Sequence, residues 1–172
     1  MIRSPRVRST MRAFAALVVV GTVAAACGPQ TASAPKTTAT ATSTPSCPPN
    51  ATTSTIFNLT NGARQSSGVP GLRWNGQLGC LAQDWSQHMA ATGVMTHRDL
   101  SATLRSPGYS TYRTLGENIL HGPGSMSAQQ MHDAWMASPD HRANILNGAF
   151  TSMGIGVAYA RGEVWATEDF GG

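Results

Sequence analysis

The chain has 172 residues, with 12 Lys and Arg against 8 Asp and Glu, which gives a formal net charge of +4. Four arginines lie in the first twelve residues, so the rest holds 12 − 4 = 8 basic residues against 8 acidic ones. A neutral body lacks the excess of Lys and Arg that neutralises a phosphate backbone, so we expect no nucleic-acid partner. The length allows one ordinary domain. Charged residues make up only 12%, about half of what is typical, which favours an exported protein.

Residues 1–27 are predicted to be an export signal. The basic start is followed by an apolar run over residues 13–26, which is shorter than the ~20 residues of a transmembrane helix and typical of a signal peptide. The run ends in Ala-Ala-Ala followed by Cys27, which resembles a bacterial lipobox. We therefore expect Cys27 to be lipidated and to anchor the protein to the membrane at the cell surface. Cleavage after Ala26 without a lipid, which gives a secreted protein, and a retained anchor helix are the alternatives.

Residues 28–50 are rich in Thr, Ala, Ser and Pro and contain one charged residue. Such a segment cannot bury enough apolar surface to offset the entropy of ordering, so it is predicted to be a disordered tether. Two cysteines remain beyond Cys27. In an oxidising compartment Cys47 and Cys80 are predicted to form a disulfide that pins the tether to the domain, with two free thiols as the alternative.

The folded domain is expected over residues 51–172. A first helix should begin after Thr52 or Thr53, either of which can cap it, and should end near Gly68. A second helix should begin after Asn75. Its apolar residues fall at offsets 0, 3, 4, 7 and 11 and form one helical face, comprising Leu78, Leu81, Ala82, Trp85 and Met89.

A third helix is predicted over residues 127–137, and Pro139 should open a short helix toward Leu146. From Met153 onward apolar residues alternate with polar or small ones, with a turn at Arg161-Gly162. This pattern predicts a C-terminal β-hairpin. Helices followed by an antiparallel hairpin indicate an α+β fold rather than a repeated βαβ unit.

Short motifs follow one another along this domain: Asn61-x-x-Arg64, Gly68-Val69-Pro70-x-Leu72-x-Trp74, His97 after Gly93, Gly116-Glu117-Asn118-Ile119, Ser138-Pro139-x-His141-Arg142-x-Asn144-Ile145-Leu146, Gly154-Ile155-Gly156-Val157 and Trp165-Ala166-Thr167-Glu168-x-Phe170-Gly171. In this order and spacing they resemble the CAP superfamily, which includes cysteine-rich secretory proteins, insect venom antigen 5 and plant pathogenesis-related proteins. The Ser-Pro-x-His-Arg form is similar to the bacterial branch, whose domain is called SCP. The resemblance covers residues 54–171 and implies a three-layer α-β-α sandwich with a small antiparallel sheet.

The resemblance also implies a cleft of two histidines and two acids that can hold a divalent cation. His97 and Glu117 match the first histidine and the glutamate of that set. This chain lacks the Gly-His-Tyr-Thr-Gln segment that supplies the second histidine in eukaryotic members, and His141 is the candidate for its place. The second acid falls at Ser138, so the chain has no acid there. Imidazole and carboxylate ligands suit zinc as well as the harder magnesium and calcium.

Each candidate ligand also has a structural interpretation. His97 could be a polar cap after Gly93, Glu117 could accept backbone N–H groups in a turn, and His141 could hold its own segment together. His121 follows Glu117 by four residues and would share its face on a helix, which makes it a possible further ligand. The motif residues without a predicted ligand role are expected to be structural: Asn118, Ser138, Arg142 and Asn144.

The sequence has no Gly-x-Ser-x-Gly elbow, no His-Glu-x-x-His and no phosphate-binding glycine loop. We therefore predict an envelope-anchored binding module for a lipid or another envelope component, with an optional divalent cation. One alternative is a metal-assisted hydrolase of peptide or cell-wall material, in which Glu117 would be the base and His97 and His141 the metal ligands. The other is a purely structural or interaction protein.

Overall fold

The computed structural model describes residues 45–172. Its helices are α1 (Ala51–Ser66), α2 (Gly76–Thr92), α3 (Leu100–Arg105), α4 (Ala128–Ala137) and α5 (Pro139–Ile145), and its strands are β1 (Arg73–Trp74), β2 (Leu115–Pro123), β3 (Ser152–Ala160) and β4 (Glu163–Gly171). The predicted signal, Cys27 and residues 28–44 of the predicted tether lie outside the described residues. Within residues 45–172, no helix combines the length and the apolar character needed to cross a membrane.

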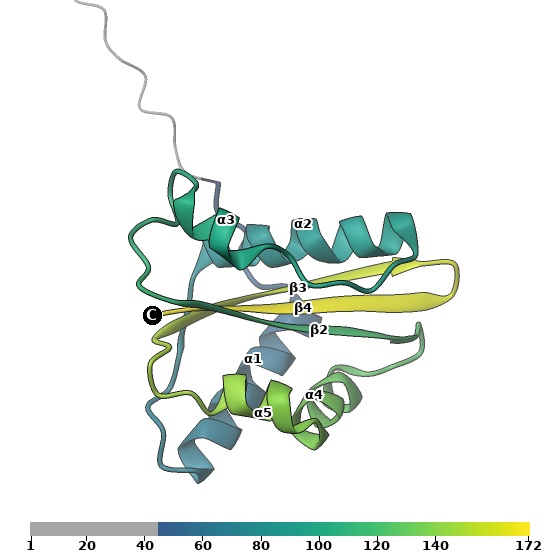
Figure 1. Ribbon diagram of the computed structural model, residues 1–172. Coiled ribbons are helices and arrows are strands. Elements are labelled where there is room, and N and C mark those ends of the chain that lie inside the picture. The colour runs from purple at the N-terminus through teal and green to yellow at the C-terminus, as the bar shows by residue number, and fades with distance from the viewer. Residues whose placement is uncertain (1–44) are drawn as a thin grey trace, which may run out of the picture. The chain divides into compact units, whose positions relative to one another are not determined.

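The elements form three layers, with the sheet in the middle (Figure 1). Helices α2 and α3 lie on one side of the sheet, and α1, α4 and α5 lie on the other. The strand order is β1-β3-β4-β2. The predicted α+β sandwich is confirmed, but its sheet is mixed rather than wholly antiparallel, because the two-residue β1 pairs parallel with β3. A strand of two residues is too short to give an alternation pattern, so the sequence contained no signal for it.

Helix α1 begins earlier in the chain than expected. Its cap is Asn50, whose side chain accepts from the Thr53 backbone N–H at 3.0 Å, while the Thr53 hydroxyl accepts from the Asn50 N–H at 2.9 Å. Thr53 therefore completes a capping box from inside the helix instead of capping it. The prediction that Thr52 or Thr53 caps α1 was wrong. Asn50 and both threonines have side chains that can cap a helix, so the sequence alone did not distinguish between them.

The predicted disulfide is confirmed: Cys47 and Cys80 are bonded, with their Cα atoms 5.0 Å apart. The Cys47 N–H also donates to the Gly76 carbonyl, and the Trp74 indole N–H donates to the Cys47 carbonyl at 3.1 Å. The contacts of the domain therefore extend to Cys47, which precedes the predicted boundary at Ala51.

Helix α2 lies directly on β3. Asn75 caps it as predicted, and it ends at Gly93 with a left-handed backbone (φ 72°). Strand β3 presents glycine to it at Gly154 and Gly156, where a Cβ atom would collide with the α2 backbone. Of the predicted apolar face, Leu78, Ala82 and Met89 are fully buried; Leu81 and Trp85 are half-buried.

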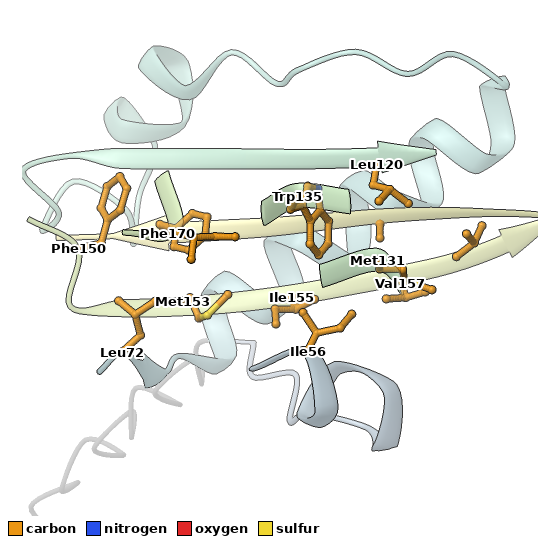
Figure 2. Packing of buried hydrophobic residues seen from close by; sticks show 13 residues of the cluster. Ile56, Leu72, Leu120, Met131, Trp135, Phe150, Met153, Ile155, Val157 and Phe170 are labelled. Atoms are coloured by element: carbon orange, nitrogen blue, oxygen red, sulfur yellow. The ribbon is translucent and has the colours of Figure 1, made fainter. Parts of the chain in front are cut away.

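The other side of the sheet carries the main core. Figure 2 shows Trp135 of α4 and Phe170 of β4 among the buried residues of this cluster, together with Phe150, which stacks on Phe170 at 5.3 Å between ring centroids. The predicted hairpin is confirmed: β3 and β4 are joined at Arg161 and Gly162, both with positive φ. Strand β2 then pairs with β4 and forms one edge of the sheet.

Candidate functional site

Two acids lie side by side where β2 pairs with β4. Glu117 of β2 is opposite Asp169 of β4 in the antiparallel register, so both side chains are on the face that α2 covers. The Glu117 side chain has no exposed surface and that of Asp169 is 2% exposed. Burial raises the pKa of Asp169 to about 7, with Arg98 opposing the rise and the charge of Glu117 adding to it.

One guanidinium compensates both acids. Arg98 donates to Asp169 Oδ2 at 3.1 Å, lies 3.7 Å from Glu117 Oε2, and also donates to the Leu81 carbonyl at 2.8 Å. Its guanidinium carbon is 5.1 Å from the centroid of the Trp85 ring. Arg98 thus ties the loop after α2 to the sheet. It carries one positive charge against two carboxyl groups, and within the described residues Glu117 Oε2 and Asp169 Oδ1 have no hydrogen-bond partner.

His97 is the exposed member of this cluster. Its Nδ1 lies 2.9 Å from Glu117 Oε1, and the same oxygen accepts from the Arg98 backbone N–H at 3.0 Å. The His97 side chain is 59% exposed. A buried carboxylate that accepts from Nδ1 orients the ring and leaves Nε2 as a lone-pair donor. The structure therefore places Glu117 behind His97, as a group that holds the imidazole.

His141 reaches the same edge of the sheet from α5. It is half-buried, and its pKa is lowered by burial and, secondarily, by the charge of His97. Its carbonyl accepts from the Asn118 side chain at 3.1 Å. We call His97, Glu117 and His141 the edge site, because His97 and His141 each lie beside β2, the edge strand that carries Glu117.

The predicted structural residues differ in what they contact. The Asn144 amide donates to Asn118 Oδ1 at 2.9 Å and to the Glu117 carbonyl at 3.3 Å, so these two asparagines join α5 to β2. Ser138 separates α4 from α5, and its backbone N–H bonds to the Trp135 carbonyl. Its side chain makes no cap hydrogen bond to α5. Arg142 is exposed in the last turn of α5.

The structure does not bring His121 to the edge site. Glu117 and His121 lie on an extended strand and not on a helix, so they are about 13 Å apart along it. His121 stacks on Trp165 with ring centroids 3.9 Å apart, and its Nε2 is 3.2 Å from Glu163 Oε1. The prediction of a shared helix face was wrong because β2 is buried on both faces and shows no alternation from which a strand could be inferred.

Across residues 45–172, no three His, Cys, Asp or Glu side chains stand in an arrangement that could hold a metal ion. The edge site offers two imidazoles and a carboxylate turned toward the protein. By their chemistry alone, two imidazoles are ligands of the kind that zinc accepts. They do not suit magnesium or calcium, which take oxygen ligands.

Sequence reasoning missed Arg98, Asp169 and Glu168. A signal for the two acids existed, because the alternation in β4 places Glu168 on one face and Asp169 on the other, and both faces of this strand are buried. An acid on a buried strand requires a compensating partner. Arg98 was an available candidate, because it directly follows the predicted ligand His97 in the chain. The partnership itself joins residues 71 apart in sequence and only the fold reveals it.

The fold and these motifs are those of a single protein family, and comparison with known families identifies it. The family model of the cysteine-rich secretory protein family, CAP, matches residues 57–170. The chain therefore belongs to the CAP family, as its motifs predicted.

Relatives with this domain occur in bacteria. YkwD of Bacillus subtilis is 35% identical over 123 residues, which is 67% of this chain and 46% of YkwD. The membrane protein YlbC of the same organism is 28% identical over 111 residues, 59% of this chain and 30% of YlbC. The chain thus spans less than half the length of these curated relatives.

Solved structures show the same fold. An extracellular SCP-domain protein from Bacillus anthracis has a TM-score of 0.57 at 29% identity, over 69% of this chain and 39% of that chain. A cysteine-rich secretory protein from Staphylococcus aureus has a TM-score of 0.55 at 25% identity, over 70% of this chain and 38% of that one. An outer surface protein of Borrelia burgdorferi, at 14% identity and a TM-score of 0.63 over 70% of this chain and 91% of that chain, shares the fold. Homologues of the chain therefore include extracellular and secreted CAP proteins.

Proposed function

We propose that this protein is an exported binding module of the cell envelope whose edge site takes a divalent cation of the zinc type through the imidazoles of His97 and His141. The observation that supports it is the pairing of an exposed His97 with the buried Glu117 carboxylate. Metal-ligating histidines usually have such a carboxylate or carbonyl on their other nitrogen. In this proposal Glu117 orients His97, and no side chain in the site is placed as a nucleophile.

Isothermal titration of the purified protein with zinc chloride at pH 7.5 tests this proposal. His97→Ala and His141→Ala should each lower the affinity at least tenfold. His121→Ala is the matched control. His121 is another partly exposed histidine, it lies on β2 outside the edge site, and its removal should leave zinc binding unchanged. Equal binding by the wild type and both edge-site variants would refute the site, and loss on His121→Ala alone would move it to the other end of β2.

A metal-assisted hydrolase with Glu117 as general base receives no support from this geometry. A general base must come within hydrogen-bond reach of the proton it removes. The Glu117 side chain has no exposed surface, and its Oε1 already accepts from His97 and from Arg98.

We propose a lipid or similar envelope component as the ligand, in the groove between α1 and α4. This groove has a volume of about 580 Å³, and it is lined by Leu59, Gly62 and Ala63 together with seven polar or charged residues, His132 among them. A Cβ atom at Gly62 would meet nothing within 4 Å. In this proposal Leu59, Gly62 and Ala63 contact an acyl chain, and the polar lining residues contact the headgroup.

Displacement of a fluorescent fatty acid tests the groove. Gly62→Leu should fill it and lower the affinity severalfold, while improving helix propensity in α1. Gly148→Leu is the control, because a Cβ there also meets nothing within 4 Å and Gly148 lies outside the groove. No binding by the wild type, or equal binding by both variants, would exclude this ligand site.

For location, we propose that Cys27 is lipidated and anchors the exported chain to the membrane. The support is the lipobox-like sequence at Cys27 and the extracellular homologues. Metabolic labelling with an alkyne fatty acid should mark the wild type and not Cys27→Ala, and only the variant should be released into the medium.

A further inference from the structure

Glu168 is a fully buried acid on the side of the sheet that α1, α4 and α5 cover. Its Oε1 accepts from the Thr60 hydroxyl and its Oε2 from the Asn118 amide, both at 3.0 Å. Within residues 45–172, no Lys, Arg or His nitrogen lies within ion-pair distance of this carboxyl group. A carboxylate with only neutral donors is costly to bury, whereas a protonated carboxyl group is not.

One side of Glu168 leads to the groove between α1 and α4. The Thr60 hydroxyl that bonds to Glu168 is also 3.4 Å from His132 Nδ1. His132 is buried, and it lines the groove. A hydroxyl between an acid and an imidazole can pass a proton from one to the other, because it is both donor and acceptor.

The other side of Glu168 leads to the edge site. The Asn118 amide that bonds to Glu168 also donates to the His141 carbonyl at 3.1 Å. Asn118 Oδ1 in turn accepts from Asn144, which bonds to the Glu117 carbonyl. One carboxyl group therefore stands between two regions that are distant in sequence, and every link between them is a direct hydrogen bond.

We propose that Glu168 is a proton-binding positioning residue that acts on His141 through Asn118 and on His132 through Thr60. On the groove side, loss of this proton changes three bonds together. The carboxyl proton passes to Thr60 Oγ1, the hydroxyl proton of Thr60 passes to His132 Nδ1, and the Nε2 proton of His132 leaves to solvent. The result is a carboxylate that accepts from Thr60 and Asn118, with one proton released and His132 still neutral.

No charged side chain on the elements that cover Glu168 forms an ion pair with it. Helices α1, α4 and α5 carry these titratable residues: Arg64, His132, Asp133, Asp140, His141 and Arg142. Glu117 and Asp169 lie on the opposite face of the sheet. Arg64 of α1 is occupied by four backbone carbonyls. Burial raises the pKa of Glu168 to about 7 in spite of the smaller, opposing effect of the bonds from Asn118 and Thr60. The change of charge thus falls near neutral pH.

Amide NMR of the protein between pH 5 and 8.5, without metal, tests this inference. The amides of His132 at the groove end and of Asn118 and His141 at the other end should share one inflection near pH 7. Glu168→Gln should abolish it at both ends. Thr60→Val should abolish it at the groove end only, and Thr60→Ser, which keeps the hydroxyl, should behave as the wild type.

Two further arms keep the test decisive. Asp169 also titrates near pH 7, so Asp169→Asn must leave the shared inflection in place; its loss there and its persistence in Glu168→Gln would overturn the proposal. If Glu168→Gln does not fold, the side-chain carboxyl ¹³C resonance of Glu168 decides in the wild type. A step near pH 7 that coincides with both ends supports the link, and a step near the ordinary pKa of 4.5 refutes it. Because no metal is present, failure of zinc binding would leave this result unaffected.

Discussion

Glu117 and Asp169 face each other across β2 and β4, and one guanidinium, that of Arg98, serves both carboxyl groups. Because Glu117 also holds His97, the exposed imidazole is connected to a buried cluster in which one guanidinium serves two carboxyl groups. This arrangement makes both the stability of the domain and the orientation of His97 sensitive to changes in the cluster.

The acid Asp169 should make the domain less stable as pH rises. Its folded pKa of about 7 exceeds the ordinary 3.8, so the folded state keeps a proton that the unfolded state loses. The contribution is fully present below pH ~4, is lost progressively up to pH ~7 and changes little above that. Thermal unfolding followed by circular dichroism should show a smaller fall in Tm between pH 5 and pH 8 for Asp169→Asn than for the wild type. An equal fall in both proteins would show that Asp169 is not the source.

Glu117→Gln should weaken zinc binding without removing either imidazole. An amide at this position no longer specifies which nitrogen of His97 carries the proton, and outer-shell changes of this kind typically lower metal affinity about 10–100-fold. Calorimetric titration of the variant with zinc measures the change, and its circular dichroism spectrum checks that the fold is retained. Unchanged affinity would show that the carboxylate does not orient His97 for binding.

Arg64 should be among the residues most sensitive to a conservative change. It is fully buried in α1, and its guanidinium donates to the carbonyls of Pro70, Ile145, Asn147 and Phe150. A lysine has a single ammonium group and cannot reach all four acceptors, so Arg64→Lys should cost about 3 kcal/mol in the free energy of unfolding. Urea denaturation measures it. The exposed Arg142→Lys, as control, should stay within about 0.5 kcal/mol of the wild type.

Gly156→Ala should weaken the packing of α2 on β3. The added methyl group would collide with the backbone of Ala82 and Gln83, and neither backbone can yield without moving α2 off the sheet. Overpacking of this kind typically costs about 1–3 kcal/mol or more. Gly148→Ala places a methyl group in open space, so its urea unfolding midpoint should equal that of the wild type. Similar midpoints for the two variants would contradict the close approach.

Local patterns allowed much of the fold to be predicted. Asn75 and Gly93 bound α2 through interactions with adjacent residues, and the periodic face between them could be counted directly. Strand β2 could not be found in this way, because Glu117 and Asn118 are both buried, on opposite faces, and no apolar alternation remains. The motifs brought His97, Glu117 and His141 together through resemblance to a family. The roles of Arg98 and Asp169 depended on the pairing of β2 with β4, which no local pattern specifies.

The disulfide between Cys47 and Cys80 determines how mechanical tension would enter the domain. A pull on the chain ahead of Cys47 passes through the sulfur atoms directly into α2, which is held on β3 by the Ser86 hydroxyl and by close backbone contact at Gly154 and Gly156. Helix α1 lies within the loop of the chain that the disulfide closes, so the shorter path through the sulfur atoms bypasses it. Tension at this end therefore acts first on α2, and it is resisted by the contacts that hold α2 on β3.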